Sequence, residues 1–246
     1  HSQELRIDPP RLWGTYYGGS DFDASQSVDL DANGNVYLAG WTRSTSAIAT
    51  VGAQQTAWVG DDDAMLVKFN SSGVRQWGTY YGGALSDAFA ACAVSGNSVY
   101  AAGNTNSTSG VATGGIHQST LGGDQDGLLV KFNTNNGTRT WATYYGGPAE
   151  DRARACAVDG GGNVYLAGFA MSDQGIALSE FVHQGTFGGG STGQSYSRGD
   201  GFLAKFAADG LLSWGTYYGG ASDDEITGVA VDWNDDVYIG GGTDKI

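Results

Sequence analysis

Short runs of alternating apolar and polar residues, separated by turns rich in Gly, Asn and Asp, follow one another along the whole chain. Residues 28–40 place two such runs around Asp31-Ala32-Asn33-Gly34-Asn35, and residues 63–81 place two more around Asn70-Ser71-Ser72-Gly73. A period of two is typical of strands, and Asn/Gly turns join strands into hairpins. The pattern therefore predicts antiparallel β-hairpins.

The hairpins belong to a long repeat. The string Trp-Gly/Ala-Thr-Tyr-Tyr-Gly-Gly begins at Trp13, Trp77, Trp141 and Trp214, so the spacings are 64, 64 and 73 residues. A Val-Tyr hairpin follows each copy of the string, and a Lys-Phe hairpin precedes the next. We label the four strands of one period a to d. Four antiparallel strands in a period of this length are typical of a β-propeller blade.

The two ends of the sequence are complementary parts of this repeat. Residues 5–17 align with strands c and d, with Arg6 at the position of Lys68, and residues 229–240 form an a–b hairpin. We therefore predict an all-β propeller of four blades, each of four antiparallel strands, closed by pairing the N-terminal c–d strands with the C-terminal a–b hairpin. The single domain would cover residues 1–246, with one blade from 1–19 plus 221–246 and the others at approximately 20–83, 84–147 and 148–220. Two alternatives stay open, a fragment of a larger propeller and a subunit that shares strands with neighbouring copies.

The amino-acid composition and net charge limit the classes of partner that the chain is expected to bind. The 246 residues include 42 Gly, few charged residues (15%) and a formal net charge of −14. This charge disfavours nucleic acid, since no basic block is present to neutralise phosphates. No apolar stretch has the roughly 20 residues that a membrane helix needs. Cys92 and Cys156 give no disulfide framework and fit as buried packing residues, so cysteine usage does not identify the compartment.

The repeated motifs resemble a known family. They read Tyr-Tyr-Gly-Gly, then an Asp, then Val-Asp-x-x-Gly-Asn-Val-Tyr-x-x-Gly, then Gly-Gly-x-x-Asp-x-x-Leu-Val-Lys-Phe-Asn. In this the chain is similar, over nearly its whole length, to the bacterial SBBP-type β-propeller repeats of secreted and cell-surface proteins. The resemblance implies an extracellular or cell-surface location and a binding or scaffolding role, with no shared catalytic residues.

Two sets of aspartates recur on the face where each blade connects to the next. The first set stands at the start of strand a and comprises Asp23, Asp87, Asp151 and Asp224. A ring of carboxylates at the mouth of a central channel could hold Ca²⁺, or each carboxylate could instead bind the backbone of its own loop. The second set, Asp63, Asp126 and Asp200, precedes strand c. Lys68, Lys131 and Lys205 are expected to pair with such carboxylates.

The long b–c connections, residues 42–62, 104–125 and 169–199, lie on the same face and suggest a ligand site. Each carries a polar pair followed by an apolar residue: Gln54-Gln55 with Trp58, His117-Gln118 with Leu121, and His183-Gln184 with Phe187. An amide or imidazole beside an aromatic ring suits sugar recognition. In the alternative, Trp58, Leu121 and Phe187 anchor their own loops. The third loop also contains Tyr196 and Arg198, and the predicted ligand-binding residues are Gln54, Trp58, His117, Gln118, His183, Gln184, Phe187, Tyr196 and Arg198.

These features favour a non-enzymatic, secreted or cell-surface binding module that recognises a glycan or a surface protein and needs no cofactor beyond a possible Ca²⁺. No common hydrolase, metalloprotease or phosphate-binding motif is present. One alternative is a structural subunit of an extracellular filament or sheath that self-associates through shared half-blades. Another is a glycoside hydrolase at the aspartate ring, although four equivalent acids do not supply the unlike pKa values that an acid and a nucleophile need.

Overall fold

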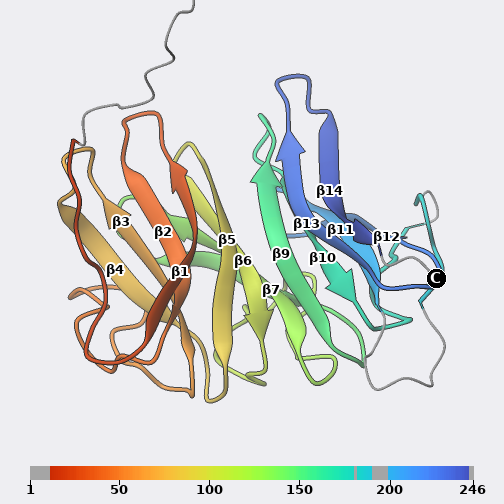
Figure 1. The fold of residues 1–246 in the computed structure, drawn as a ribbon, viewed down its shortest axis with the longest axis horizontal. Helices are drawn as coiled ribbons and strands as arrows, with labels where there is room; N and C mark the ends of the chain where they lie inside the picture. The colour runs from red at the N-terminus through yellow and green to blue at the C-terminus, as the bar shows by residue number, and fades with distance from the viewer. Residues whose placement is uncertain (1–11, 180–181, 190–198, 244–246) are drawn as a thin grey trace, which may run out of the picture.

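The computed structural model describes residues 12–179, 182–189 and 199–243 (Figure 1). Every regular element in these ranges is a β-strand, which confirms the all-β prediction. No helix that could cross a membrane is found in the described ranges.

Fourteen strands follow the predicted a-to-d order within the described residues. The a strands are β1 (Asp23–Leu30), β5 (Asp87–Ser95), β9 (Asp151–Val158) and β13 (Asp224–Val231). The b strands are β2 (Val36–Thr42), β6 (Ser98–Thr105), β10 (Val164–Ala170) and β14 (Val237–Thr243). The c strands are β3 (Asp63–Phe69), β7 (Asp126–Asn133) and β11 (Asp200–Phe206). The d strands are β4 (Arg75–Tyr81), β8 (Arg139–Tyr145) and β12 (Leu212–Tyr218).

The strands form three four-stranded antiparallel sheets and one hairpin. The first sheet is β1–β4, the second β5–β8 and the third β9–β12, and the terminal hairpin is β13–β14. Turn chemistry sets the register, since Leu30 faces Val36 across the five-residue turn and Gly34 there has a φ of 73°. Phe69 likewise faces Arg75 across the second predicted turn. Both predicted types of hairpin are therefore confirmed.

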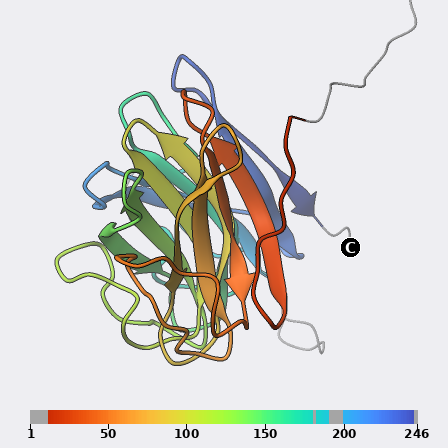
Figure 2. The same cartoon turned by 90° about the vertical axis from the view of Figure 1, so that its left-hand side faces the viewer.

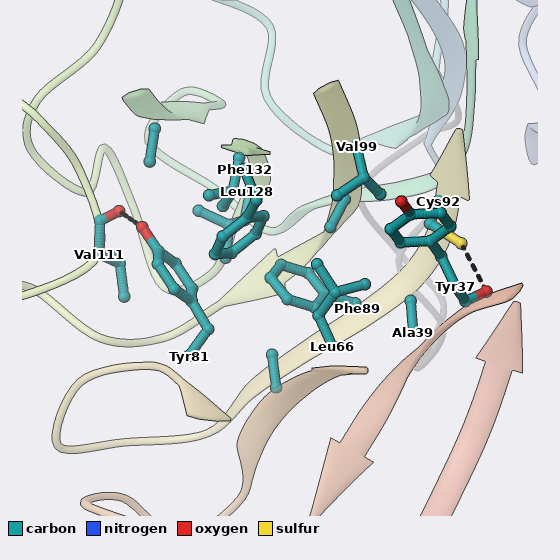
Figure 3. Packing of buried hydrophobic residues seen from close by; sticks show 14 of the residues in the cluster. Tyr37, Ala39, Leu66, Tyr81, Phe89, Cys92, Val99, Val111, Leu128 and Phe132 are labelled. Carbon is teal, nitrogen blue, oxygen red and sulfur yellow. Dashed lines mark hydrogen bonds between the residues drawn. The ribbon is translucent and has the colours of Figure 1, made fainter. Parts of the chain in front are cut away.

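Consecutive sheets pack face to face: they follow one another from left to right in Figure 1 and lie one behind another in Figure 2. Strand β1 packs on β5, β5 on β9 and β9 on β13, so the a strands line the inside of the array. Apolar side chains from two sheets fill each junction. At the first junction Tyr81 stacks on Phe89, and Phe132 meets both rings edge-on (Figure 3). These aromatic side chains are buried in a larger apolar cluster that holds the sheets together.

The predicted closure of a four-bladed ring is not present in the described residues. Strands β13 and β14 form a two-stranded sheet, and residues 12–17 form no strand. Instead Trp13 Nε1 donates to Ser71 O at 3.1 Å and Tyr17 Oη to Ile48 O at 2.8 Å, so this segment packs on the first sheet. Strands β1 and β13 do not pack on each other as ring neighbours would, and they lie apart in Figure 1. Residues 1–11, which include the predicted N-terminal strand c, lie outside the described residues.

Candidate functional site

The face of the molecule that carries the long b–c connections is called the loop face. On this face a glutamine joins the start of each c strand to the end of its d strand. The side-chain Nε2 of Gln118 donates to Asp126 Oδ2 at 2.7 Å, and its Oε1 accepts from the N–H of Gly146 at 3.1 Å. The Oγ1 of Thr143 accepts a further bond from the backbone N–H of Gln118. The same bonds recur in the other sheets, at Gln55 with Asp63, Gly82 and Thr79, and at Gln184 with Asp200, Gly219 and Thr216. We call each set a glutamine clasp.

The aspartates that open the a strands cap the Gly-Gly turns before them. In every copy the N–H of the second glycine donates to the carboxylate, at 2.7–2.8 Å, from Gly19 to Asp23, Gly83 to Asp87, Gly147 to Asp151 and Gly220 to Asp224. Ser44, Ser107 and Ser172 add hydroxyl bonds to the first three. These bonds give the carboxylates a local structural role.

The two aspartate sets meet in pairs around the first glycine of each Gly-Gly. A Cβ added at Gly146 would lie 2.5 Å from Asp126 Oδ1 and 2.9 Å from Asp151 Oδ2. Gly82 stands in the same way between Asp63 and Asp87, and Gly219 between Asp200 and Asp224. The sequence separates the members of each pair by about one strand hairpin, and only the junction between two sheets brings them together. Glycine is required there because any side chain would collide with both carboxylates.

Burial raises the pKa of these acids. It raises the pKa of Asp87 and of Asp126 to about 6, and the charge of Asp151 adds to the effect at Asp126. The pKa values of Asp63, Asp151 and Asp200 are also raised, mainly by burial. Among the described residues, the Oδ1 atoms of Asp126 and Asp200 accept no hydrogen bond. The junctions between sheets thus hold buried carboxylates of which some oxygen atoms have no hydrogen-bond donor within the described ranges.

Metal coordination at the predicted ring has little geometric basis. In the described part of the chain no three Asp, Glu, His or Cys side chains converge as metal ligands would. Asp23, Asp87, Asp151 and Asp224 each point to their own turn, and calcium at these residues stays a prediction.

The lysines do not pair with either aspartate set, contrary to the sequence prediction. Lys68 donates to Thr134 O in the second sheet at 3.0 Å, and Lys131 donates to Ala208 O in the third at 2.8 Å. Lys205 instead lies 3.4 Å from Asp159 Oδ2 in its own sheet. Lys68 and Lys131 therefore tie one sheet to the next, because a backbone carbonyl of the next turn lies within their reach.

The predicted ligand-binding residues are mostly engaged inside the protein. The amides of Gln118 and Gln184 belong to the clasps, and Gln54 Oε1 accepts from the backbone N–H of Arg139. Trp58 packs on the buried Ile48, Met65 and Tyr80 group, and Phe187 meets Tyr217 edge-on at 5.7 Å. Both rings thus anchor their own loops, as the alternative interpretation expected.

The two histidines occupy equivalent positions with different surroundings. His117 packs on Tyr145 of the second sheet and on Phe206 of the third, with each ring centroid 5.8 Å from its own. His183 is exposed and stacks on Tyr218 at 5.0 Å. Tyr196 and Arg198 lie outside the described residues.

Sequence reasoning missed an exposed aromatic group at the loop-face end of the first sheet. Phe22 is 58% exposed and stacks on Trp41, with centroids 5.1 Å apart and planes 16° apart. Arg43 lies over the Trp41 ring at 5.6 Å and pairs with Asp62. The sequence did contain a signal for this group. Each b strand has a glycine at an equivalent position, and the residue that follows this glycine differs in every copy: Trp41, Asn104, Phe169 and Gly242.

Several hollows lie where the terminal hairpin meets the third sheet. One cavity of about 450 Å³ is lined by Arg154 and Glu225, which form a 2.7 Å ion pair, together with Phe169, Met171 and Asp224. The second, of about 320 Å³, is more apolar and is lined by Val182, His183, Leu203, Trp214, Tyr218, Val237 and Ile239, with Thr216. We call the second hollow the terminal groove.

Comparison with known proteins adds no relative: no protein-family model matches the chain, and no curated protein matches it.

Proposed function

We propose that this chain is a non-enzymatic structural module of secreted or cell-surface assemblies, in which half-blades of neighbouring molecules complete one another. One observation carries the proposal. Residues 12–17 make on the first sheet the contacts that β4 makes on the second and β8 on the third: Trp13, Trp77 and Trp141 donate to Ser71 O, Thr134 O and Ala208 O. Tyr17, Tyr81 and Tyr145 donate likewise to Ile48 O, Val111 O and Ile176 O.

Residues 12–17 therefore occupy the position of a d strand that is packed on the following sheet, which here is the first sheet. The terminal hairpin offers the complementary half, because β14 pairs with β13 on one side and with no other described strand. An unpaired strand edge of this kind is a template for another strand. Closure within one chain, which would give the four-bladed ring, is the rival arrangement.

Light scattering after size exclusion tests the proposal over a range of protein concentrations. We expect a mass above that of one chain, 25.5 kDa. A variant that lacks residues 1–11 retains all described strands and is expected to be monomeric. A full chain that stays monomeric at every concentration would contradict strand sharing.

Glycan recognition is a second candidate, favoured by the exposed Phe22–Trp41 stack on the loop face. Aromatic faces stack on the C–H groups of sugars. Binding on a glycan array should be lost in Phe22→Ala and kept in Val51→Ala, which changes a fully exposed residue of the neighbouring loop. Binding that is equal in both variants would remove this candidate.

The geometry argues against the hydrolase alternative. Its carboxylates are hydrogen-bonded to their own loops in every sheet, and the three pairs have nearly the same surroundings. Acid and nucleophile need different environments to divide their roles. The proposed structural function requires no cofactor.

A further inference from the structure

Two tyrosines of the terminal groove region are exposed although their equivalents are buried. Tyr218 is 50% exposed, whereas Tyr81 and Tyr145 at the same position of the other sheets are 2% and 0% exposed. Tyr238 is 59% exposed, and its equivalents Tyr37, Tyr100 and Tyr165 are exposed by no more than 3%. The repeat therefore provides an internal control, and the difference must come from the element that covers this position in the other sheets.

The element that covers Tyr81 and Tyr145 is strand c of the next sheet. The equivalents of Tyr238 are instead in contact with the c-strand lysine and the d-strand tryptophan of their own sheet. Phe132 meets Tyr81 edge-on at 5.3 Å, and Phe206 meets Tyr145 edge-on at 5.6 Å. Phe69 covers Tyr17 in the same way at 5.7 Å. The terminal groove thus lacks one apolar side chain from a c strand, and its apolar lining matches such an occupant.

Register identifies which residue would supply it. The phenylalanine of each c strand lies opposite the first valine of its b strand, as in the pairs Val36–Phe69, Val99–Phe132 and Val164–Phe206. The equivalent valine of β14 is Val237. Residues Leu5-Arg6-Ile7 align with Val67-Lys68-Phe69, so Ile7 would lie opposite Val237 and over Tyr218.

Charge is complementary at the same place. Lys205 lies over the Tyr165 ring at 4.9 Å and within 3.4 Å of Asp159, whose carboxylate also accepts from Tyr165. Around β14 the tyrosine and the carboxylate of this arrangement are present, because Tyr238 donates to Asp232 at 3.3 Å, and no described cation lies over the Tyr238 ring. Arg6 occupies the sequence position of Lys205 and would reach this tyrosine and carboxylate.

We propose that the terminal groove is filled by residues 5–7 of a second copy of this chain, and that two copies complete each other reciprocally. This inference rests on the proposed function and names its partner. Three sheets and two half-blades make four blades per chain, so two chains make an eight-bladed ring. Such a ring pairs the open edge of each β14 with a c strand, and eight blades lie within the usual range of propellers. Two-fold pairing is also the commonest symmetry of protein oligomers.

Engineered cysteines test the register. Residues directly opposite each other in a sheet have Cβ atoms about 5 Å apart, within the range that a disulfide can bridge after small adjustment. Ile7→Cys and Val237→Cys are prepared separately, mixed and oxidised. We expect a reducible two-chain product that contains one copy of each variant, while the parent chain and each single variant alone give none.

The double variant Ile7→Cys/Val237→Cys distinguishes the remaining arrangements. A disulfide within one chain, in a particle with the mass of one chain, would overturn both this inference and strand sharing. Absence of any cross-link in both experiments would overturn the predicted pairing. Association that persists in that case would leave the proposed function standing.

Light scattering distinguishes the ring from a polymer. We expect a particle of twice the chain mass of 25.5 kDa, whereas an open-ended series of larger species would overturn the two-fold ring but leave the proposed function. Tyr218→Arg places a charge in the groove and should convert the two-chain particle to single chains. The control variant Val51→Arg changes a fully exposed loop residue and should leave the mass unchanged, and the same mass for both variants would overturn the role of the groove.

Discussion

Gln118 holds Asp126 by a 2.7 Å bond from its side-chain amide, and the other end of the same amide accepts the N–H of Gly146. Asp126 is fully buried, so this contact joins the start of β7 to the end of β8 and compensates part of a carboxylate that water cannot reach. Because the same clasp recurs in all three sheets, it is a structural element of the repeat.

Removal of the clasp should be costly. Gln118→Ala leaves Asp126 without its amide donor and Gly146 without its acceptor, so we expect a loss of about 2–3 kcal/mol in the free energy of unfolding. Gln76→Ala, at an exposed glutamine of β4 that bonds only to nearby Val74 O, should change it by less than about 0.5 kcal/mol. Urea denaturation of both variants measures the difference, and equal stabilities would show that the clasp contributes nothing.

Asp126 should make the protein less stable as the pH rises. Its pKa is raised to about 6 in the folded protein, above the unfolded value of about 3.9. The folded state therefore binds the proton more tightly, and this stabilisation is complete below about pH 4 and is lost as the pH rises through 6. In Asp126→Asn the fall in unfolding free energy between pH 4 and pH 7 should be smaller by about 2 kcal/mol.

Asp126→Asn should also raise the free energy of unfolding at neutral pH. The asparagine amide can donate toward Asp151, while its oxygen keeps the bonds from Gln118 and Gly122. Urea denaturation at several pH values, with the exposed Asp61→Asn as the control, checks the slope. A slope in Asp126→Asn identical to that of the parent protein would show that Asp126 does not titrate in this range.

Two glycines allow backbone strain to be separated from packing between sheets. Gly137 has a φ of 69°, and a Cβ there would lie 2.6 Å from Trp77 Cε3 of the first sheet. Gly96 has a φ of 56° and no atom within 4 Å of an added Cβ. Both alanine variants strain the left-handed backbone, but only Gly137→Ala also displaces Trp77.

Gly137→Ala should therefore destabilise by about 1–3 kcal/mol more than Gly96→Ala in thermal or urea unfolding. Tryptophan fluorescence of the folded protein should change in the first variant only. Equal effects of the two substitutions would show that the contact between this turn and Trp77 is loose.

Cys92 should react only when its sheet junction opens. Its side chain is buried at the first junction, and burial raises the pKa of the thiol to about 11 (Figure 3). At pH 8 we expect alkylation by iodoacetamide to be on the order of 100-fold slower in the native protein than in urea, since the thiolate is the reactive form. Peptide mass spectrometry measures the rate, and rapid native labelling would mean that the junction opens readily.

Local pattern was enough to predict the hairpins and their order. The alternation around residues 31–35 and the glycine at position 34 determine which residues face each other in β1 and β2. A five-residue turn recurs at residues 159–163 and 232–236, whereas β5 and β6 are joined by the shorter turn Gly96-Asn97. Such contacts join residues a few positions apart, so their geometry depends on the turn and on which face is apolar. The blade boundaries followed from the same periodicity.

The contacts of the glutamine clasp could not be predicted from local sequence pattern. Gln54 and Gln55 are neighbours in sequence, yet Gln54 accepts from Arg139 in the second sheet and Gln55 holds Asp63 in its own. Lys68 reaches a carbonyl 66 residues away, and no charge pattern in the sequence indicates that partner. These contacts depend on how one sheet is placed against the next.

The sequence by itself determined the strands, their order and their pairing into hairpins, because each of these is specified within one repeat. Only the tertiary structure decided that the aspartates meet in pairs at the sheet junctions, that the loop amides are used internally, and that residues 12–17 pack on the first sheet and not on the terminal hairpin. The physical reason is that the angle between sheets arises from the sum of many apolar contacts between residues of different repeats, and no single motif encodes it.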